Sequence, residues 1–387
     1  MSLRGALLGF GQVAEKAHAP AWKKLSPQVQ IVAIADPLPE RRAEAKNHFP
    51  QARIYADPSH LLKQEKSCSF VDICTPPRDH ARWSCEALGR GFHVLCEKPL
   101  ALNIPEAHAL QKLAERKRRI LYTVHNWKHA PILSRAASLL RKKIIGEIRH
   151  AQWIVLRNLP ARGAADPRGS GRLSSSRGPW GRLRRSYGDP RGSGNFSFSR
   201  SPWGRTRRVS GDPKGGFWRL DPRLAGGGIL IDHGWHAFYL LLSFLRQPPL
   251  SISAHMEFLR QGLEHTAWCW IRFPAATAQI HLTWRSQYRK NLIFLHGTRG
   301  ILAILDDKIR LRYARPGGKL KERIWKFPEA LSSGSAHPEW FSRMLPDFLK
   351  GLRHPLRRSG NLREALTTLR LIRKAYRSTQ AKRPITF

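Results

Sequence analysis

Short apolar runs alternate with amphipathic stretches through the first third of the chain. Each run is too short for a buried helix and lacks polar–apolar alternation, so the runs predict strands that are covered on both faces. The predicted strands are the run that ends at Leu8 and the segments 31–35, 70–74, 92–96 and 120–124, and the clearest helices between them are 79–89 and 105–118. Strands and helices that alternate in this way predict a doubly wound parallel sheet.

The pattern changes after about residue 148. Several later segments alternate polar and apolar residues, which predicts a largely antiparallel sheet with one covered face. These segments are 148–156, 252–258, 266–273, 278–284, 292–296, 309–313 and 323–327, and helices are expected near 228–245, 340–352 and 361–378. We therefore expect an α/β domain over residues 1–125, followed by an α+β domain over residues 126–387.

A tandem repeat interrupts the second half of the chain. The motif Asp-Pro-Arg-Gly-Ser-Gly starts at Asp166 and again at Asp189, and a partial copy starts at Asp212, so the period is 23 residues. The segment 166–211 is rich in Arg, Gly, Ser and Pro, and we expect a disordered basic insertion without a core. A tandem duplication in a tolerant loop is the favoured interpretation. The alternative is a basic arm that holds RNA, DNA or an anionic surface.

Composition adds a strong positive charge to this picture. The 68 Lys and Arg against 27 Asp and Glu give a formal net charge of +41, which attracts polyanions at low salt. The basic residues are scattered and no nucleic-acid-binding motif is visible in the sequence, so a nucleic-acid partner is not favoured. No apolar run approaches the roughly 18 to 20 residues of a membrane span, and the immediate start of a strand leaves no room for a signal peptide. We expect no membrane association.

At 387 residues the chain is long enough for two domains with separate cores. Its five cysteines lie in apolar surroundings without a CxxC spacing, which is typical of a reduced, cytoplasmic protein. The sequence has neither an HExxH motif nor a cysteine–histidine cluster, so no metal site is predicted.

The turn after the first strand has the chemistry of a diphosphate site. Its first glycine permits a tight turn, its second lets the backbone approach phosphate oxygens, and the small Ala14 lets the next helix pack on the sheet. The start of that helix directs unpaired backbone N–H groups and a positive dipole end toward the diphosphate. The turn residues predicted to bind the cofactor are Gly9, Phe10, Gly11, Gln12 and Val13.

An acidic residue, Asp36, ends the second strand at about the distance expected of the carboxylate that accepts hydrogen bonds from the adenosine ribose. A carboxylate at this place repels the 2′-phosphate of NADP, so NAD is the predicted cofactor. Arg41 and Arg42 follow closely in the sequence and keep NADP as an alternative. Strand, glycine turn, helix, strand and acid together predict a Rossmann unit.

Further polar motifs stand where later strands end. Thr75-Pro76-Pro77, Glu97-Lys98-Pro99 and Asn126 each follow an apolar run. Ligands of doubly wound sheets bind beyond the carboxyl ends of the strands. The sequence therefore predicts a ligand site along this one edge.

In the second half, Asp232 and His236 follow three consecutive glycines and are spaced i and i+4 in a predicted helix, so both should project from one face and share a site. Histidine has an unperturbed pKa near 6.5, which suits a base for a hydroxyl proton. The carboxylate would orient the imidazole, and the ammonium of Lys98 would stabilise a developing alkoxide. A helix-start role for Asp232 and a core role for His236 are the structural alternatives.

These stretches together resemble the glucose–fructose oxidoreductase/inositol dehydrogenase (Gfo/Idh/MocA) family. The resemblance covers nearly the whole chain, and the duplicated segment falls outside it. It depends on an ordered set of motifs: Gly9-x-Gly11-x-x-Ala14, Ala35-Asp36-Pro37, the segments 73–80 and 97–101, Asn126-Trp127, the glycine-rich segment 226–236 and the closing helix from Asn361 to Leu366.

The resemblance implies an oxidoreductase that transfers a hydride between NAD(P) and a hydroxyl or carbonyl carbon of a sugar, polyol or sugar nucleotide, with anionic carbohydrates among the candidate substrates. Carried over to this chain, the catalytic residues are Lys98, Asp232 and His236. Besides the turn and Asp36, the cofactor residues are Thr75, Pro76, His80, Glu97 and Lys98. The substrate residues are Asn126, Trp127 and His233.

Two other interpretations stay open. One is a catalytically silent Rossmann-fold nucleotide sensor or nucleic-acid-associated protein that uses its basic repeats; the presence of Lys98, Asp232 and His236 disfavours it. The other is a decaying gene copy whose duplicated loop disables the enzyme. The substrate is not specified by the sequence, because loops that shape pockets vary freely on such folds. We also expect a homo-oligomer, a dimer or tetramer, that forms through the C-terminal sheet.

Overall fold

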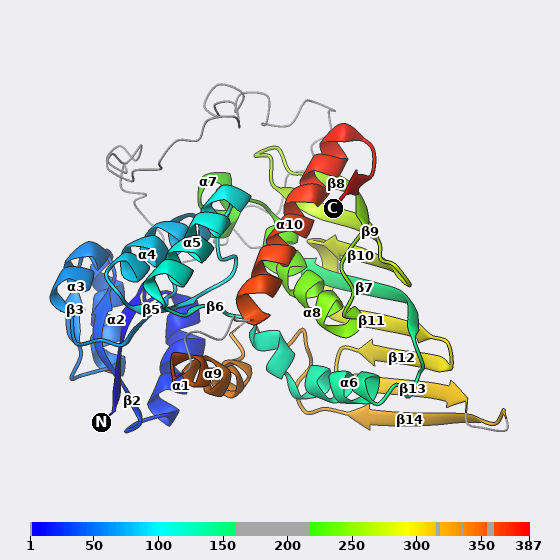
Figure 1. Ribbon diagram of the computed structural model, residues 1–387, viewed down its shortest axis with the longest axis horizontal. Coiled ribbons are helices and arrows are strands. Elements are labelled where there is room, and N and C mark those ends of the chain that lie inside the picture. Colours follow the sequence, from blue (N-terminus) through cyan, green and yellow to red (C-terminus); the bar gives the residue numbers. More distant parts are fainter. Residues whose placement is uncertain (1, 160–216, 315–317, 335, 354–359) are drawn as a thin grey trace.

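The computed structural model describes residues 2–159, 217–314, 318–334, 336–353 and 360–387. Two sheets stand apart, and helices lie between them (Figure 1). The insertion predicted at 166–211 lies outside the described residues.

The N-terminal part is built on a six-stranded sheet whose neighbouring strands all run parallel. Its order is β3-β2-β1-β4-β5-β6, so β1 is central and has β2 on one side and β4 on the other. The strand order reverses there, and the ends of such strands form the binding crevice of doubly wound sheets. The strands are β1 (Leu3–Leu8), β2 (Val29–Ala35), β3 (Arg53–Tyr55), β4 (Phe70–Ile73), β5 (His93–Cys96) and β6 (Leu121–Thr123).

Helices cover both faces of this sheet and bury its apolar strands in two clusters. The helices of one face are α3 (Pro58–Gln64), α4 (Pro77–Gly89) and α5 (Ile104–Lys117). The other face packs against η1 (Ala14–His18), α1 (Ala19–Lys24), α2 (Pro39–His48) and α9 (Pro338–Arg353). Because α9 comes from the end of the chain and lies beside α1 (Figure 1), the C-terminal part helps to close the N-terminal core.

The second sheet has nine strands in the order β14-β13-β12-β11-β7-β10-β9-β8-β15. Strands β7 and β10 pair in parallel and the other neighbours are antiparallel. Helices α6 (Pro131–Arg141), α8 (Trp235–Leu245) and α10 (Gly360–Ala381) lie on one face (Figure 1). The strands are β7 (Ile148–Asn158), β8 (Ser251–Phe258), β9 (Glu264–Arg272), β10 (Thr277–Thr283), β11 (Arg285–Gly297), β12 (Gly300–Leu305), β13 (Lys308–Ala314), β14 (Leu320–Lys326) and β15 (Ile385–Thr386).

Four short helical segments connect these elements near the junction of the two sheets. They are the 3-10 turns η2 (Asn126–His129) and η4 (Phe217–Leu220), the helix α7 (Pro222–Ala225) and the π-helical turn η5 (Leu230–Gly234). The single helix expected over 228–245 is thus divided into η5 and α8, which changes the direction of its polar side chains.

The predicted fold class is confirmed, since a parallel α/β sheet is followed by a mixed, largely antiparallel one. Among the described residues, the segment Pro222–Leu245 is long and apolar enough to cross a membrane by length and composition alone. Its most apolar 18-residue window has a mean hydropathy of 1.2, and 78% of that window is buried inside the protein, as in the core helix of a globular domain. The predicted domain boundary at residue 125 stays a prediction.

Candidate active site

The turn between β1 and η1 has the conformation that its glycines predict. Gly9 has a φ of +86°, and a Cβ atom there would lie 3.0 Å from backbone atoms of Cys74 and Thr75 at the end of β4. Gly11 has no atom within 4 Å of the place where its side chain would stand. A ligand can therefore approach the backbone at Gly11. Gln12 and Val13 continue into the helical turn that follows.

The carboxylate of Asp36 is buried at the end of β2 and held by two backbone N–H groups. Phe10 donates to Oδ2 at 2.7 Å and Leu38 donates to Oδ1 at 2.9 Å. Burial raises the pKa of Asp36. Each carboxylate oxygen keeps a second acceptor position for a ribose hydroxyl.

The two arginines that follow Asp36 are engaged within the protein. Arg41 is buried and forms an ion pair with Glu15 at 3.2 Å. One guanidinium nitrogen of Arg42 donates to the backbone oxygens of Asp36 at 3.0 Å and Pro37 at 2.9 Å. These contacts direct part of their donor capacity away from a 2′-phosphate.

His80 links two of the predicted cofactor motifs. Its Nδ1 lies 2.7 Å from the backbone oxygen of Pro99, and its Nε2 lies 2.7 Å from that of Thr75. Burial lowers the pKa of His80. Since both ring nitrogens face backbone carbonyls, the structure places His80 as a support for the turns after β4 and β5 and not as a group directed at a ligand.

Lys98 and Asp232 meet where the two halves of the chain come together. The Lys98 Nζ donates to Asp232 Oδ1 at 3.0 Å and to the Asp232 backbone oxygen at 2.7 Å. Arg219 Nε and His233 Nε2 also approach Asp232 Oδ2, at 3.7 and 3.6 Å. Burial alone would raise the pKa of Asp232, but Lys98, His233 and Arg219 together outweigh it and hold that pKa well below its usual value. Burial lowers the pKa of His233 to about 3.

A buried carboxylate that sequence reasoning missed fixes the glycine segment before Asp232. Glu264 Oε1 accepts hydrogen bonds from the backbone N–H groups of Gly228 at 2.7 Å and Leu230 at 2.9 Å, and from the Tyr376 hydroxyl at 2.8 Å. A Cβ atom at Gly228 would stand 2.1 Å from the Glu264 backbone oxygen. The glycine is therefore required for the close approach of this turn to β9.

His236 does not pair with Asp232, contrary to the expectation from their i, i+4 spacing. Among the described residues, the His236 ring forms its hydrogen bond with the Tyr239 hydroxyl, which lies 3.1 Å from Nδ1. The reason is η5, because a π-helical turn has more residues per turn than an α-helix and rotates Asp232 away from the face that His236 occupies. Burial holds the pKa of His236 well below its usual value, so the imidazole is neutral at pH 7.

Two indole rings pack beside His236. Trp127 in η2 stacks on the imidazole with ring centroids 4.7 Å apart, and the edge of Trp340 contacts Trp127. Glu329 accepts from Trp340 Nε1 at 2.8 Å and so fixes that indole. Asn126 precedes Trp127 and is buried in the same turn. The two predicted substrate residues of η2 thus reach the neighbourhood of His236.

A buried charged network under the glycine turn was also missed by sequence reasoning. His18 Nδ1 lies 2.8 Å from Asp72 Oδ2, and His18 Nε2 lies 3.0 Å from Glu97 Oε1. Trp22 Nε1 donates to the same Asp72 oxygen at 2.7 Å. The one sequence signal was Asp72, an acidic residue inside the apolar run 70–74. His18 therefore holds Glu97, which is predicted to bind the cofactor, through this contact.

His18, Asp72 and Cys74 also bring potential metal-ligand atoms within 4.8 Å of one another. Their atoms are already engaged, because His18 Nδ1 contacts both Asp72 and the Cys74 thiol, which lies 3.2 Å away. Burial raises the pKa of Cys74 to about 12, which keeps this thiol protonated. Metal ions prefer the thiolate. The arrangement suits a hydrogen-bond network better than a metal centre.

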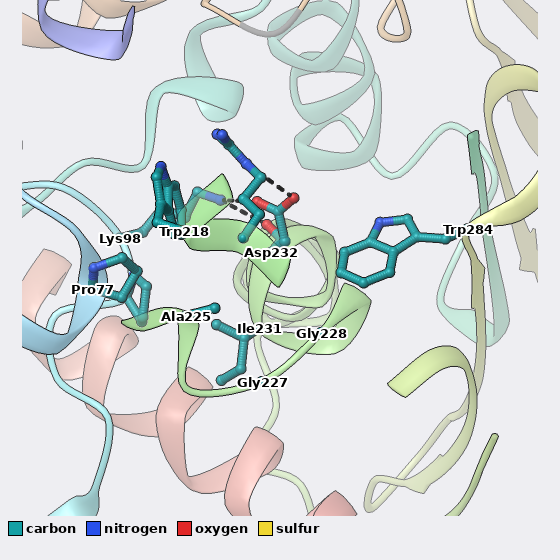
Figure 2. A pocket seen from close by; sticks show the side chains of 11 residues that line it. Pro77, Lys98, Trp218, Ala225, Gly227, Gly228, Ile231, Asp232 and Trp284 are labelled. Atoms are coloured by element: carbon teal, nitrogen blue, oxygen red, sulfur yellow. Dashed lines mark hydrogen bonds and ion pairs between the residues drawn. The ribbon is translucent and has the colours of Figure 1, made fainter. Parts of the chain in front are cut away.

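A small hollow that opens to solvent lies beside the Lys98–Asp232 pair (Figure 2). Trp218 and Lys98 stand on one side of Asp232, and Trp284 stands on the other (Figure 2). The residues that line it include Pro77, Lys98, Trp218, Arg219, Gly228, Ile231, Asp232 and Trp284. The hollow therefore places a cation, a carboxylate and two indole rings within reach of one small molecule.

Both halves of the chain match models of one oxidoreductase family. Residues 3–125 match the model described as "Oxidoreductase family, NAD-binding Rossmann fold". Residues 194–303 match the model described as "GFO/IDH/MocA C-terminal domain". The two matches lie in the order in which the two sheets are built.

Among curated relatives, the chain is 28% identical over 146 residues to D-glucoside 3-dehydrogenase of Escherichia coli (strain K12), a stretch that covers 38% of this chain and 41% of that protein. It is 32% identical over 143 residues to D-apiose dehydrogenase of Paraburkholderia graminis, which covers 37% of each chain. The matched stretch thus spans about two fifths of the length of these relatives.

Among solved structures, levoglucosan dehydrogenase in complex with NADH superposes with a TM-score of 0.76 at 18% identity, covering 100% of this chain and 99% of that one. A probable dehydrogenase from Thermotoga maritima superposes with a TM-score of 0.71 at 18% identity, covering 99% and 98%. At these identities the likeness establishes the two-domain fold.

Proposed function

Because the chain belongs to the Gfo/Idh/MocA oxidoreductase family, we propose that it moves a hydride between NAD and a hydroxyl or carbonyl carbon of a sugar, polyol or sugar nucleotide. The observation that carries this proposal is the pairing of Lys98 with Asp232 across the junction of the two sheets, at the edge of a hollow. This arrangement favours an enzyme over a silent nucleotide sensor, because a sensor has no need of a buried ammonium beside its ligand.

The glycine turn and Asp36 fit an NAD molecule. Open space at Gly11 admits a diphosphate, and the helical segment that follows presents its N-terminal end. The Asp36 carboxylate is fixed by Phe10 and Leu38 in a position to accept from a ribose. Bound NAD supplies the hydride acceptor. The hydrogen bonds of Arg42 to backbone oxygens support NAD over NADP.

The three predicted catalytic residues have separate roles. The neutral imidazole of His236 accepts the hydroxyl proton, and the ring is oriented by Tyr239 and Trp127. The ammonium of Lys98 stabilises the developing alkoxide. Asp232 holds the Lys98 side chain in place, and this role replaces the orientation of His236 that the sequence suggested.

The catalytic assignment is tested by NADH formation from a panel of polyols and nucleotide sugars. Once a substrate is found, His236→Ala and Lys98→Met should each lower kcat by roughly 10²–10⁴, while NADH affinity stays within a few-fold. His60→Ala and Lys143→Met, two exposed side chains, serve as matched controls. A His236→Ala protein that turns over at the parent rate would move proton transfer to another group, and undetectable NADH binding by the parent would refute the proposed function itself.

We also infer self-association through the uncovered face of the C-terminal sheet. Trp268 and His281 stack there with ring centroids 5.1 Å apart, and Trp270 is 47% exposed. Apolar side chains on an open sheet face are typical of subunit interfaces, and sedimentation velocity of the full chain tests this inference.

All five cysteines are free thiols, which supports a reducing, cytoplasmic setting.

A further inference from the structure

Positive groups outnumber negative ones around Asp232. Lys98 and Arg219 both approach its side chain, at 3.0 and 3.7 Å. Arg157 at the end of β7 is also close enough to act on the charges of Asp232 and His233. Among the described residues, one carboxylate therefore lies near three cations in a largely buried site.

Arg219 has donor capacity to spare. Its guanidinium lies over the Trp218 ring, 4.4 Å from the ring centroid. The 3.7 Å separation of its Nε from Asp232 is too long for a hydrogen bond. Its side chain is 33% exposed and lines the hollow, so a ligand in the hollow can reach its N–H groups.

Arg157 is a buried cation that donates to no carboxylate in the described part of the chain. Its side chain is 2% exposed, and its terminal nitrogens donate to the backbone oxygens of Leu156 and Lys290 and to the Asn291 side chain. Its Nε is buried and has no hydrogen-bond partner among the residues that the structure describes. Burial lowers the pKa of Arg157 to about 10. A buried charge without a partner is costly unless something else compensates for it.

The position of Arg157 directs that charge toward the hollow. It follows Ala151, Trp153 and Val155 on the buried face of β7. In the parallel pair of β7 and β10, Leu156 lies opposite Thr283, so the next residues, Arg157 and Trp284, stand side by side. Trp284 lines the hollow (Figure 2).

The other acidic groups nearby are already engaged. Asp306 accepts from the backbone of Asn291 at 3.1 Å and of Ser332 at 3.0 Å, and from the Ser332 hydroxyl at 2.6 Å. Glu97 is paired with His18 and accepts from the Lys98 backbone N–H at 3.0 Å. Among the described residues, positive charge beside the hollow is therefore in excess and can attract a ligand.

We propose that the substrate carries an anionic group, a carboxylate or a phosphate, which Arg219 binds directly and the buried charge of Arg157 attracts. The proposal rests on the proposed function, since it takes the molecule in the hollow to be the sugar or polyol that reacts. A planar guanidinium suits either anion, because it presents two parallel N–H donors. The two indoles, Trp218 and Trp284, offer apolar faces to the rest of the substrate.

Calorimetric titration of the full chain loaded with NADH tests this with matched sugars. D-glucuronate is compared with D-glucose, D-galacturonate with D-galactose, and D-glucose 6-phosphate distinguishes phosphate from carboxylate. We expect at least one anionic sugar to bind about tenfold or more tightly than its neutral counterpart, with the difference shrinking at high salt. Arg219→Gln should bring the ratio near one, and Arg219→Lys should retain part of it.

Arg223→Gln is the matched control, because this arginine is close in the sequence, has a side chain that is 80% exposed and pairs with Asp221. It should leave the ratio unchanged. Equal affinity for charged and neutral sugars, binding of no anionic sugar, or a ratio that survives Arg219→Gln would each overturn the proposal. Failure of the parent to bind NADH would instead refute the proposed function, whereas NADH binding with turnover of neutral sugars alone would refute only the anionic substrate.

Discussion

The buried network around His18 gives a stability prediction that can be worked from the structure. His18 lies between Asp72 and Glu97 with one ring nitrogen at 2.8 Å from the first carboxylate and the other at 3.0 Å from the second. A ring that donates from both nitrogens is an imidazolium. Burial opposes that charge, but Asp72 and Cys74 together outweigh burial and raise the pKa of His18 well above its ordinary value of 6.5. His18→Gln removes the shared cation.

The size of the effect follows from what is left behind. Glutamine can donate to one carboxylate, so the other remains buried without its partner. Breaking a buried ion pair in this way costs about 3–5 kcal/mol. With an unfolding entropy of about 2.1 cal/mol/K per residue, a chain of 387 residues loses roughly 1.2 °C of melting temperature per kcal/mol. The expected fall in Tm for His18→Gln is therefore about 4–6 °C.

The effect should depend on pH in a defined direction. A raised pKa means that the stabilisation by His18 is complete below its ordinary value of 6.5 and is lost as pH rises through the raised value. Burial alone would raise the pKa of Glu97, but the contacts with His18 help to lower it below its ordinary value of 4.5. The stabilisation by Glu97 is therefore complete above pH 4.5 and is lost as pH falls through the lowered pKa. The difference between parent and His18→Gln should be greatest between pH 4.5 and 6.5.

Thermal unfolding followed by circular dichroism across this pH range measures the difference. His60→Gln, which replaces an exposed histidine, should leave Tm within about 1 °C of the parent. Combining His18→Gln with Asp72→Asn should cost less than the sum of the two single changes, since both act on one network. A His18→Gln protein as stable as the parent, or a difference that grows above the raised pKa, would show that His18 is not the bridging cation.

Two further predictions concern the cofactor and the repeats. The parent should bind NADH at least several-fold more tightly than NADPH by fluorescence titration, and Asp36→Ser should narrow that gap; equal affinities in the parent would contradict the role of Asp36. Deletion of residues 166–211, which lie outside the described residues, should leave a chain that folds and binds NADH but has lost much of any affinity for nucleic acid. Loss of folding on deletion would instead make the repeats part of the core.

The fold was largely predictable because its strands are marked by burial on both faces. Runs such as 70–74 and 92–96 have no alternation, and this distinguishes a parallel sheet covered by helices from the alternating strands of the second half. The comparisons confirm the family resemblance that the ordered motifs indicated. The continuously apolar strand β12 was not among the predicted strands of the second sheet.

The site was predictable in its residue types but not in its pairings. The motifs of Lys98 and Asp232 identified two residues that do meet, although they are 134 positions apart. The geometry of Asp232 and His236 was wrong, because an α-helical spacing was assumed where the chain makes a π-helical turn. Glu264 and His18 were missed because their importance comes from long-range partners, and a single acidic or histidine residue in a strand or helix carries no local pattern that names them.

The π-helical turn explains how two separate sheets build one site. Glu264 on β9 receives hydrogen bonds from Gly228, Leu230 and Tyr376, so β9 and α10 decide where η5 begins. That turn presents Asp232 to Lys98, which comes from the end of β5 in the other sheet. If η5 were an ordinary α-helical turn, Asp232 would face His236, and Lys98 would lose its carboxylate. The wider turn therefore separates two tasks that the sequence spacing seemed to join: Asp232 holds the ammonium, and His236 remains free of the carboxylate, neutral, and able to accept a proton.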